Sequence, residues 1–227
     1  DGVSPLPERY DHLPLTWREE SVGAFAAWHL ALLDLVLQQP TADAYFLLQD
    51  DVVLYDRQSL REYLEGILWP GDRAGMVTLF YTGFEGRPGW HAMREGCWCG
   101  AQAFVFSPEV ARRIAADGEL IRIAMAAATG GHVRIPETLF DWVRRNELEV
   151  WYANPSLAQH IGNTSTIWLD SALAGGRRAP WFAGGMETPF AVEEPLDGFP
   201  EDAFPVPVEF QDGYRARLKR GRARMRE

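Results

Sequence analysis

The stretch Tyr45-Phe46-Leu47-Leu48-Gln49-Asp50-Asp51-Val52 joins an apolar run to an amide and two carboxylates. The unbroken apolar residues 44–48 predict a strand that is buried on both faces, as in a parallel or mixed α/β sheet. Ligands of such sheets bind outside the carboxyl ends of the strands, so we expect the acids to face a crevice. Neighbouring carboxylates repel each other, and a divalent cation relieves that repulsion. The alternative interpretation is an ordinary acidic turn, because Asp is a frequent turn residue.

Composition narrows the class of protein. The chain has 227 residues, of which 47% are hydrophobic and 24% charged, and this is typical of one globular domain with a substantial core. A formal net charge of -10 argues against nonspecific binding to nucleic acid. We find no bilayer-spanning apolar run and no signal peptide. Cys97 and Cys99 are too close in sequence for a good disulfide and form only half of a zinc site, so we expect a reducing, cytoplasmic setting.

Residues 1–168 contain a mixture of predicted helices and strands. A helix is expected from Glu19 to Gln38, because its apolar residues follow the i, i+3, i+4 spacing, with a capping box that begins at Thr16 and a stop at Pro40. The other expected helices cover residues 59–68, 108–116, 119–128 and 137–146, and the other expected strands cover residues 76–81, 101–106 and 148–152. Buried strands together with these helices predict an α/β domain.

Two segments interrupt the pattern. Residues 82–100 form a long Gly-rich segment with three aromatic side chains, and such loops are usually functional. Residues 169–227 are rich in Gly and Pro without a clear period, so we expect an irregular extension. Its basic C-terminus is either solvated or in contact with an anionic partner, such as the inner face of a membrane.

Two motifs make residues 23–168 resemble the GT-A glycosyltransferases, particularly bacterial relatives of the branching N-acetylglucosaminyltransferases. In the first, Asp43 to Val52, the sequence Gln49-Asp50-Asp51 looks like the family's DxD region. The second, PSLAQHIG at Pro155 to Gly162, is similar to the family's PSLxQHxG segment, and GAQAFVFSP lies between them at Gly100 to Pro108. The resemblance implies a GT-A (Rossmann-like) mixed sheet flanked by helices. It also implies sugar transfer from a nucleotide-sugar donor to a hydroxyl group of a carbohydrate acceptor.

The resemblance further implies a Mn²⁺ or Mg²⁺ site. Asp51 would bind the ion directly, and Asp50 would reach it through water or hold a hydroxyl group of a UDP-linked donor. Gln49 stands where many members have an acid. His160 matches a late histidine that returns to the metal or its phosphates, and imidazole suits Mn²⁺ better than Mg²⁺. The ion would neutralise the charge that develops on the leaving diphosphate.

An inverting transfer also needs a base for the acceptor hydroxyl. The sequence PETLFDW at residues 136–142 resembles the family's acidic element, which makes Asp141 the first candidate and Glu137 the second. The alternative for both is a solvated helix face with arginine partners. Gly100, with Trp98 before it, looks like the family's glycine loop beside the donor sugar and acceptor.

The front of the chain departs from the family. GT-A enzymes begin with an apolar strand and a loop that hold the nucleotide base, and residues 1–15 contain no such strand. Either the GT-A domain is N-terminally incomplete, or the nucleotide base is held by an arrangement unlike that of the family, and we expect weak donor binding. Two other functions stay open. One is a carbohydrate-binding protein on the same fold without catalysis, and the other is a metal-dependent phosphohydrolase that uses Asp50, Asp51 and His160.

Overall fold

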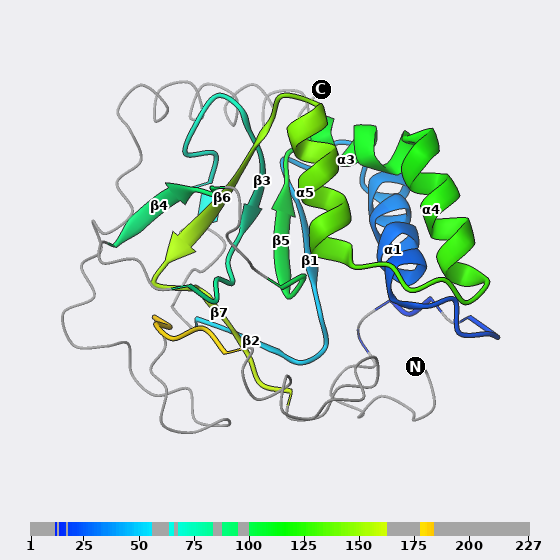
Figure 1. Cartoon of the computed structure of the whole chain (residues 1–227), viewed down its shortest axis with the longest axis horizontal. Coiled ribbons are helices and arrows are strands. Elements are labelled where there is room, and N and C mark those ends of the chain that lie inside the picture. Colours follow the sequence, from blue (N-terminus) through cyan, green and yellow to red (C-terminus); the bar gives the residue numbers. More distant parts are fainter. Residues whose placement is uncertain are drawn as a thin grey trace.

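The chain forms a mixed α/β structure, and in its described part four helices flank a mixed sheet of five strands (Figure 1). The computed structural model describes residues 12, 14–16, 18–55, 64–65, 68–83, 88–94, 100–162 and 178–183. In chain order the elements are α1 (Ala24–Gln38), β1 (Tyr45–Leu48), β2 (Val52–Leu54), β3 (Ala74–Thr78), β4 (Gly89–Ala92), β5 (Ala103–Phe106), α3 (Pro108–Ala116), α4 (Gly118–Ala128), α5 (Ile135–Arg145), β6 (Glu149–Asn154) and β7 (Ala158–His160).

The strand order of the main sheet places three carboxyl ends at one edge. The order is β1-β5-β3-β6-β4, in which β3 and β6 pair in parallel and the other neighbours pair antiparallel. Strands β1, β3 and β6 therefore run in the same direction. The two remaining strands, β2 and β7, form a separate antiparallel pair beyond this edge, in the lower part of Figure 1.

Two apolar clusters sandwich the main sheet. The strand β5 shows the division, because Phe104 and Phe106 belong to the cluster beneath the helices, whereas Ala103 and Val105 belong to the cluster on the opposite face. This is the period of two expected of a strand that is covered on both sides. The second cluster includes residues of β2 and β7, so the small sheet is packed against the main one.

The strand that ends in the acidic motif lies at the side of the sheet. Among the described strands β1 pairs only with β5, and Leu48 is 47% exposed while Tyr45 and Leu47 are buried. The prediction that this strand is buried on both faces holds only in part. Tyr45 and Leu47 are buried in the cluster beneath the helices, whereas on the other face Phe46 is half-buried against the second cluster and Leu48 is exposed.

Helix boundaries followed the sequence where the capping residues were strong. The helix α3 covers the predicted residues, and the hydroxyl oxygen of Ser107 accepts a hydrogen bond from the amide of Val110 at 3.3 Å. The helix α1 ends before Pro40 as expected, but it begins at Ala24 instead of Glu19. Its N-cap is Gly23, with φ at 76° and no side-chain cap, so the predicted capping box at Thr16 is not formed.

Three short strands were not predicted. The strand β4 lies within the expected loop of residues 82–100 and pairs antiparallel with β6, from Gly89 opposite Asn154 to Ala92 opposite Trp151. The strands β2 and β7 have three residues each. All three strands form by pairing with residues distant in sequence, so no local sequence pattern predicts them.

Part of the expected extension is attached to the domain. The side chain of Gln159 accepts a hydrogen bond from the amide of Ala179 at 2.9 Å and donates one to the Ala179 carbonyl at 3.1 Å. Phe182 forms an isolated bridge with Ser156, and both Ala179 and Phe182 are buried. Residues 178–183 therefore pack against the segment that leads into β7.

Some predictions fall on residues that are not described. Trp98, Cys97, Cys99, the basic C-terminus and most of the expected helix at residues 59–68 lie outside the described residues. Residues 14–16 and 18–23, which are described, contain no strand before α1, and residues 1–11 lie outside the described part. Of the helices that are described, none has the length and apolar character needed to cross a membrane.

Candidate functional site

The small sheet brings Asp51 and His160 into direct contact. The Oδ2 atom of Asp51 and the Nε2 atom of His160 are 2.8 Å apart. The backbone fixes this approach, because Val52 lies opposite His160 in the β2–β7 ladder and the amide of Ile161 donates to the Asp51 carbonyl at 2.9 Å. Val52 and Val53 are β-branched and suit a short strand at this place. The two predicted metal ligands are therefore neighbours in space.

The pair is only partly exposed to solvent. The side chain of His160 is 8% exposed and that of Asp51 is 37% exposed. The hydrogen bond from His160 lowers the pKa of the Asp51 carboxyl below its ordinary value, against the opposing effect of burial. Asp51 Oδ1 and His160 Nδ1 are both buried and have no hydrogen-bond partner within the described part of the chain. Each such atom costs about 1–3 kcal/mol, so buried unpartnered atoms call for an explanation.

Gly162 and Phe80 enclose the pair. A Cβ atom on Gly162 would lie 2.6 Å from Asp51 Oδ2 and 2.9 Å from His160 Nε2, closer than real Cβ contacts. A side chain at this position would therefore require the Asp51 carboxylate or the His160 ring to shift. On another side the fully buried ring of Phe80 lies 6.5 Å from the imidazole, centroid to centroid. The site thus combines a close backbone with an apolar wall.

The pair fits two adjacent positions on a hard divalent ion. Two ligand atoms at about 2.1 Å from an octahedral ion and at right angles to each other are about 3.0 Å apart. The observed separation of 2.8 Å is that of a hydrogen bond between the two side chains, and it is also close to this value. No group of three or more His, Cys, Asp or Glu side chains that could hold an ion occurs among the described residues. Such ions often take only one or two protein ligands and complete their shell with water and substrate phosphates. The residues present therefore fit an ion that binds together with a phosphate ligand.

The predicted donor-binding residues lie beside this pair. Asp50 is exposed in the turn between β1 and β2, and Gln49 is half-buried. The amide of Gln49 donates to the carbonyl of Gln102 at 3.0 Å, which places the acidic turn next to the segment that begins at Gly100. The structure thus brings Gln49, Asp50 and Gly100 to one region.

The two candidate bases lie on α5. Asp141 has a 59% exposed side chain that forms an ion pair with Arg144. It lines an open groove of about 680 Å³ between α4 and α5, together with Glu119, Ile123, Thr138, Arg144 and Arg145. Glu137 is less exposed, at 32%, and pairs with Arg134 at 3.2 Å. Among the described contacts, none joins either carboxylate to Asp51 or His160.

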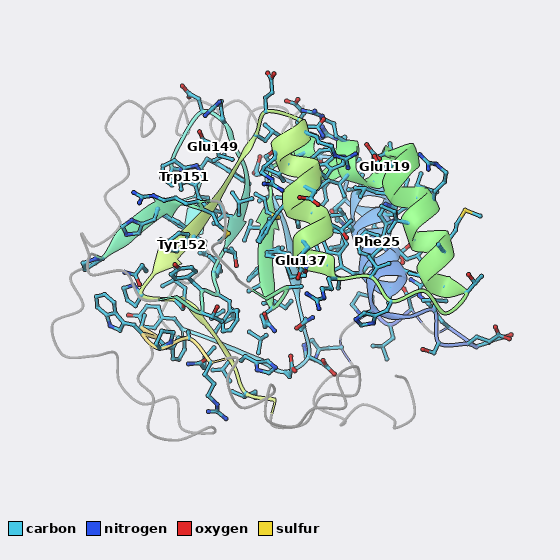
Figure 2. All side chains as sticks on the ribbon, in the orientation of Figure 1. Phe25, Glu119, Glu137, Glu149, Trp151 and Tyr152 are labelled. Atoms are coloured by element: carbon cyan, nitrogen blue, oxygen red, sulfur yellow. The ribbon has the colours of Figure 1, made fainter. Side chains whose placement is uncertain are left out.

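Helix direction distinguishes these two carboxylates. Glu137 belongs to the first turn of α5, and Figure 2 shows it at the lower end of that helix. This is the end that lies toward β2 and β7 in Figure 1. Asp141 follows four residues later, about 6 Å further along the helix axis. Glu137 is therefore the carboxylate of α5 placed closer to the carboxyl edge of the sheet.

Sequence reasoning missed Gln102. Its side chain is 4% exposed, and its Oε1 atom is buried with no hydrogen-bond partner in the described part of the chain. The available signal was a polar amide at the start of the otherwise apolar run AQAFVF, at residues 101–106. Gly162 was also given no role, although it belongs to the quoted PSLAQHIG segment.

Neither a scan against protein-family models nor a search of curated proteins found a match to this chain. Inference about function therefore depends on the geometry above and on the motifs that the sequence carries.

Proposed function

We propose that this protein is a metal-dependent glycosyltransferase of the GT-A type. It would transfer a sugar from a nucleotide-sugar donor, UDP-linked, to a hydroxyl group of a glycan or related acceptor. The observation that carries the proposal is the approach of Asp51 and His160 to 2.8 Å at the carboxyl edge of a mixed sheet. Ligands of α/β sheets bind at such an edge, and these residues come from the two motifs that resemble the family.

Asp51 and His160 would hold a Mn²⁺ or Mg²⁺ ion together with the donor diphosphate. When bound, the ion supplies positive charge that stabilises the diphosphate leaving group. The protein keeps the two side chains in place through the β2–β7 ladder and leaves room for them at Gly162. Asp50, which is exposed in the adjoining turn, is free to bind a metal-bound water or a donor hydroxyl.

The acceptor base would come from α5. The resemblance names Asp141 first. We favour Glu137, because the side chain of Asp141 is 59% exposed in the groove between α4 and α5, whereas that of Glu137 is only 32% exposed. A carboxylate acts as a base only within hydrogen-bond reach of the acceptor hydroxyl, and Glu137 lies nearer the sheet edge.

Calorimetric titration tests the proposal. UDP and UDP-N-acetylglucosamine are titrated into the protein with and without Mn²⁺, and into Asp51→Ala and Asp43→Ala. Asp43 is an exposed acid just before β1, so its removal controls for a general loss of negative charge. We expect weak binding that requires Mn²⁺, survives in Asp43→Ala and falls at least about tenfold in Asp51→Ala. Binding that needs neither Mn²⁺ nor Asp51 would overturn the proposal.

Product analysis separates the proposal from its two alternatives. A transferase moves the sugar to an acceptor, whereas a phosphohydrolase releases phosphate or free sugar without one. A carbohydrate-binding protein would bind saccharides with Asp51→Ala as well as with the unchanged chain, and would give no turnover with any donor.

A further inference from the structure

Gln102 carries a polar group that the fold buries but does not satisfy. The side chain is 4% exposed, and no donor in the described part of the chain reaches its Oε1 atom. Burying an amide oxygen without a hydrogen bond costs free energy. A leucine of similar size would avoid this cost, so the described residues give the Oε1 atom no structural role.

Gln102 lies at the same edge of the sheet as the Asp51–His160 pair. Its carbonyl accepts the amide of Gln49 at 3.0 Å, two residues before Asp51. The next residue, Ala103, accepts a hydrogen bond from the amide of Leu79, whose own carbonyl accepts the amide of Ala158 at the start of β7. Gln102 is therefore bonded directly to the segment before Asp51, and its neighbour Ala103 is connected through Leu79 to the start of β7.

Gly100 makes room for the amide. A Cβ atom on Gly100 would lie 1.7 Å from the Oε1 atom of Gln102 and 2.5 Å from its side-chain carbonyl carbon. The carboxamide thus lies directly over the Cα atom of Gly100, in space that any other residue would fill. A side chain at position 100, which the resemblance places beside the donor sugar, would therefore require the Gln102 carboxamide to shift.

We propose that the Gln102 carboxamide recognises the sugar of the donor, by accepting a hydrogen bond from a hydroxyl or acetamido N–H group. The inference depends on the proposed function, since it places the sugar beside a diphosphate held at Asp51 and His160. A neutral amide suits this task because it adds no charge to a site that must attract a diphosphate. Rotation about the side-chain torsions of Gln102 presents the amide to a ligand without moving β5. A site built to hydrogen-bond a sugar discriminates strongly against a ligand that lacks the partner group.

The test compares UDP with UDP-glucose and UDP-N-acetylglucosamine, all titrated in Mn²⁺. The proteins are the unchanged chain, Gln102→Leu, Gly100→Ala and, as a control, Gln38→Leu at the exposed end of α1. The unchanged chain is expected to bind at least one sugar nucleotide more tightly than UDP. Gln102→Leu and Gly100→Ala should lose this preference, about 5- to 10-fold, while their affinity for UDP stays the same. Gln38→Leu should keep both the preference for the sugar nucleotide and the affinity for UDP.

Thermal unfolding supplies a second measurement that does not use a ligand. Because Oε1 has no partner, Gln102→Leu should unfold at the same or a higher temperature than the unchanged chain. A lower midpoint would mean that the amide stabilises the fold, and would overturn the inference.

The binding results distinguish failure of this inference from failure of the proposed function. Absence of Mn²⁺-dependent UDP binding by the unchanged chain would overturn both. UDP binding with no preference for either sugar nucleotide, or a preference that survives in Gln102→Leu, would overturn only the role of Gln102. An equal loss of UDP and sugar-nucleotide affinity in Gln102→Leu would also overturn it.

Discussion

Asp51 Oδ2 and His160 Nε2 lie 2.8 Å apart although 109 residues separate them in the chain. Their approach follows from the ladder in which Val52 lies opposite His160, and from the narrow space that Gly162 leaves beside them. A change in the neighbouring backbone should therefore disturb the pair even when both side chains are retained.

Gly162→Ala should weaken Mn²⁺-dependent binding of UDP. The added Cβ atom would lie 2.6 Å from Asp51 Oδ2 and 2.9 Å from His160 Nε2, so the present arrangement of the two side chains has to change. We expect affinity to fall about tenfold or more, which corresponds to about 1.4 kcal/mol, as measured by calorimetry.

Gly118→Ala is the matched control for this substitution. A Cβ atom on Gly118 meets nothing within 4 Å, and Gly118 is the first residue of α4, where Ala is the better helix former. This variant should bind UDP normally and unfold at the same or a slightly higher urea concentration. Normal UDP binding by Gly162→Ala would show that the pair does not take part in binding.

Replacing the two carboxylates of α5 should separate their roles in turnover. Glu137→Gln is expected to lower the rate of sugar transfer by about 10²- to 10⁴-fold and leave donor affinity unchanged, because a base acts on the acceptor and not on the diphosphate. Asp141→Asn should have a much smaller effect, since Asp141 is 59% exposed and paired with Arg144.

Glu119→Gln controls for the charge of the groove, because Glu119 lines it and pairs with Arg145 without being a candidate base. Steady-state rates of sugar transfer, measured with saturating donor, distinguish the two candidate bases. A large loss in Asp141→Asn with none in Glu137→Gln would return the role of base to Asp141.

Elements with strong local chemistry were predictable from the sequence. Ser107 and Pro108 fixed the start of α3, because a hydroxyl cap and a proline at the first helical position both act within one turn. The carboxylate of Asp51 and the imidazole of His160 were singled out through motifs, and the structure places them in contact.

Features that depend on distant partners were not predictable. The strands β2, β4 and β7 form by pairing with residues distant in sequence. The position of β1 as the outermost strand depends on which strands pair beside it. The buried amide of Gln102 depends on how closely it approaches Gly100, which no pattern of residue types encodes. Local propensity carries no information on such tertiary contacts.

Asp117→Ala should destabilise the helical layer substantially. Its Oδ1 atom accepts the amides of Glu119 and Leu120 at the start of α4, at 2.9 and 3.0 Å, and its Oδ2 atom accepts the indole N–H of Trp142 on α5 at 2.9 Å. Loss of an N-cap and of a partner for a largely buried indole should cost about 2–3 kcal/mol in urea denaturation.

Two variants calibrate this value. Ser107→Ala removes a single cap bond of 3.3 Å at α3 and should cost at most about 1 kcal/mol, while Asp117→Asn keeps a neutral acceptor and should lie between the two. Burial raises the pKa of Asp117, but the hydrogen bonds from Leu120, Trp142 and Glu119 outweigh it and hold the pKa below 3.8. The contribution of Asp117 is therefore present above that pH and is lost as the pH falls further. If Asp117→Ala lowered the free energy of unfolding no more than Ser107→Ala does, Asp117 would not join the start of α4 to Trp142 as proposed.

The buried His29 should make the protein less stable in mild acid. Burial lowers the pKa of His29 below 6.5, although its contact with the Ile114 carbonyl and the nearby Asp117 act in the opposite direction. As the pH falls below 6.5, the unfolded chain takes up a proton that the buried imidazole does not, so the free energy of unfolding decreases. Its contribution is thus complete above pH 6.5 and is lost below it.

His29→Gln isolates this effect. A glutamine stays neutral throughout the titration and can still donate to the Ile114 carbonyl, which lies 3.2 Å from the His29 Nε2 atom. Urea denaturation of both proteins at pH 7.5, 6.5 and 5.5 gives the change in unfolding free energy with pH for each. As the pH is lowered, we expect the free energy of unfolding to fall more steeply for the unchanged chain than for His29→Gln. The slopes against pH are compared, and not the absolute values, because the substitution also alters packing. Equal slopes would mean that His29 takes up its proton as readily in the folded protein as in the unfolded chain.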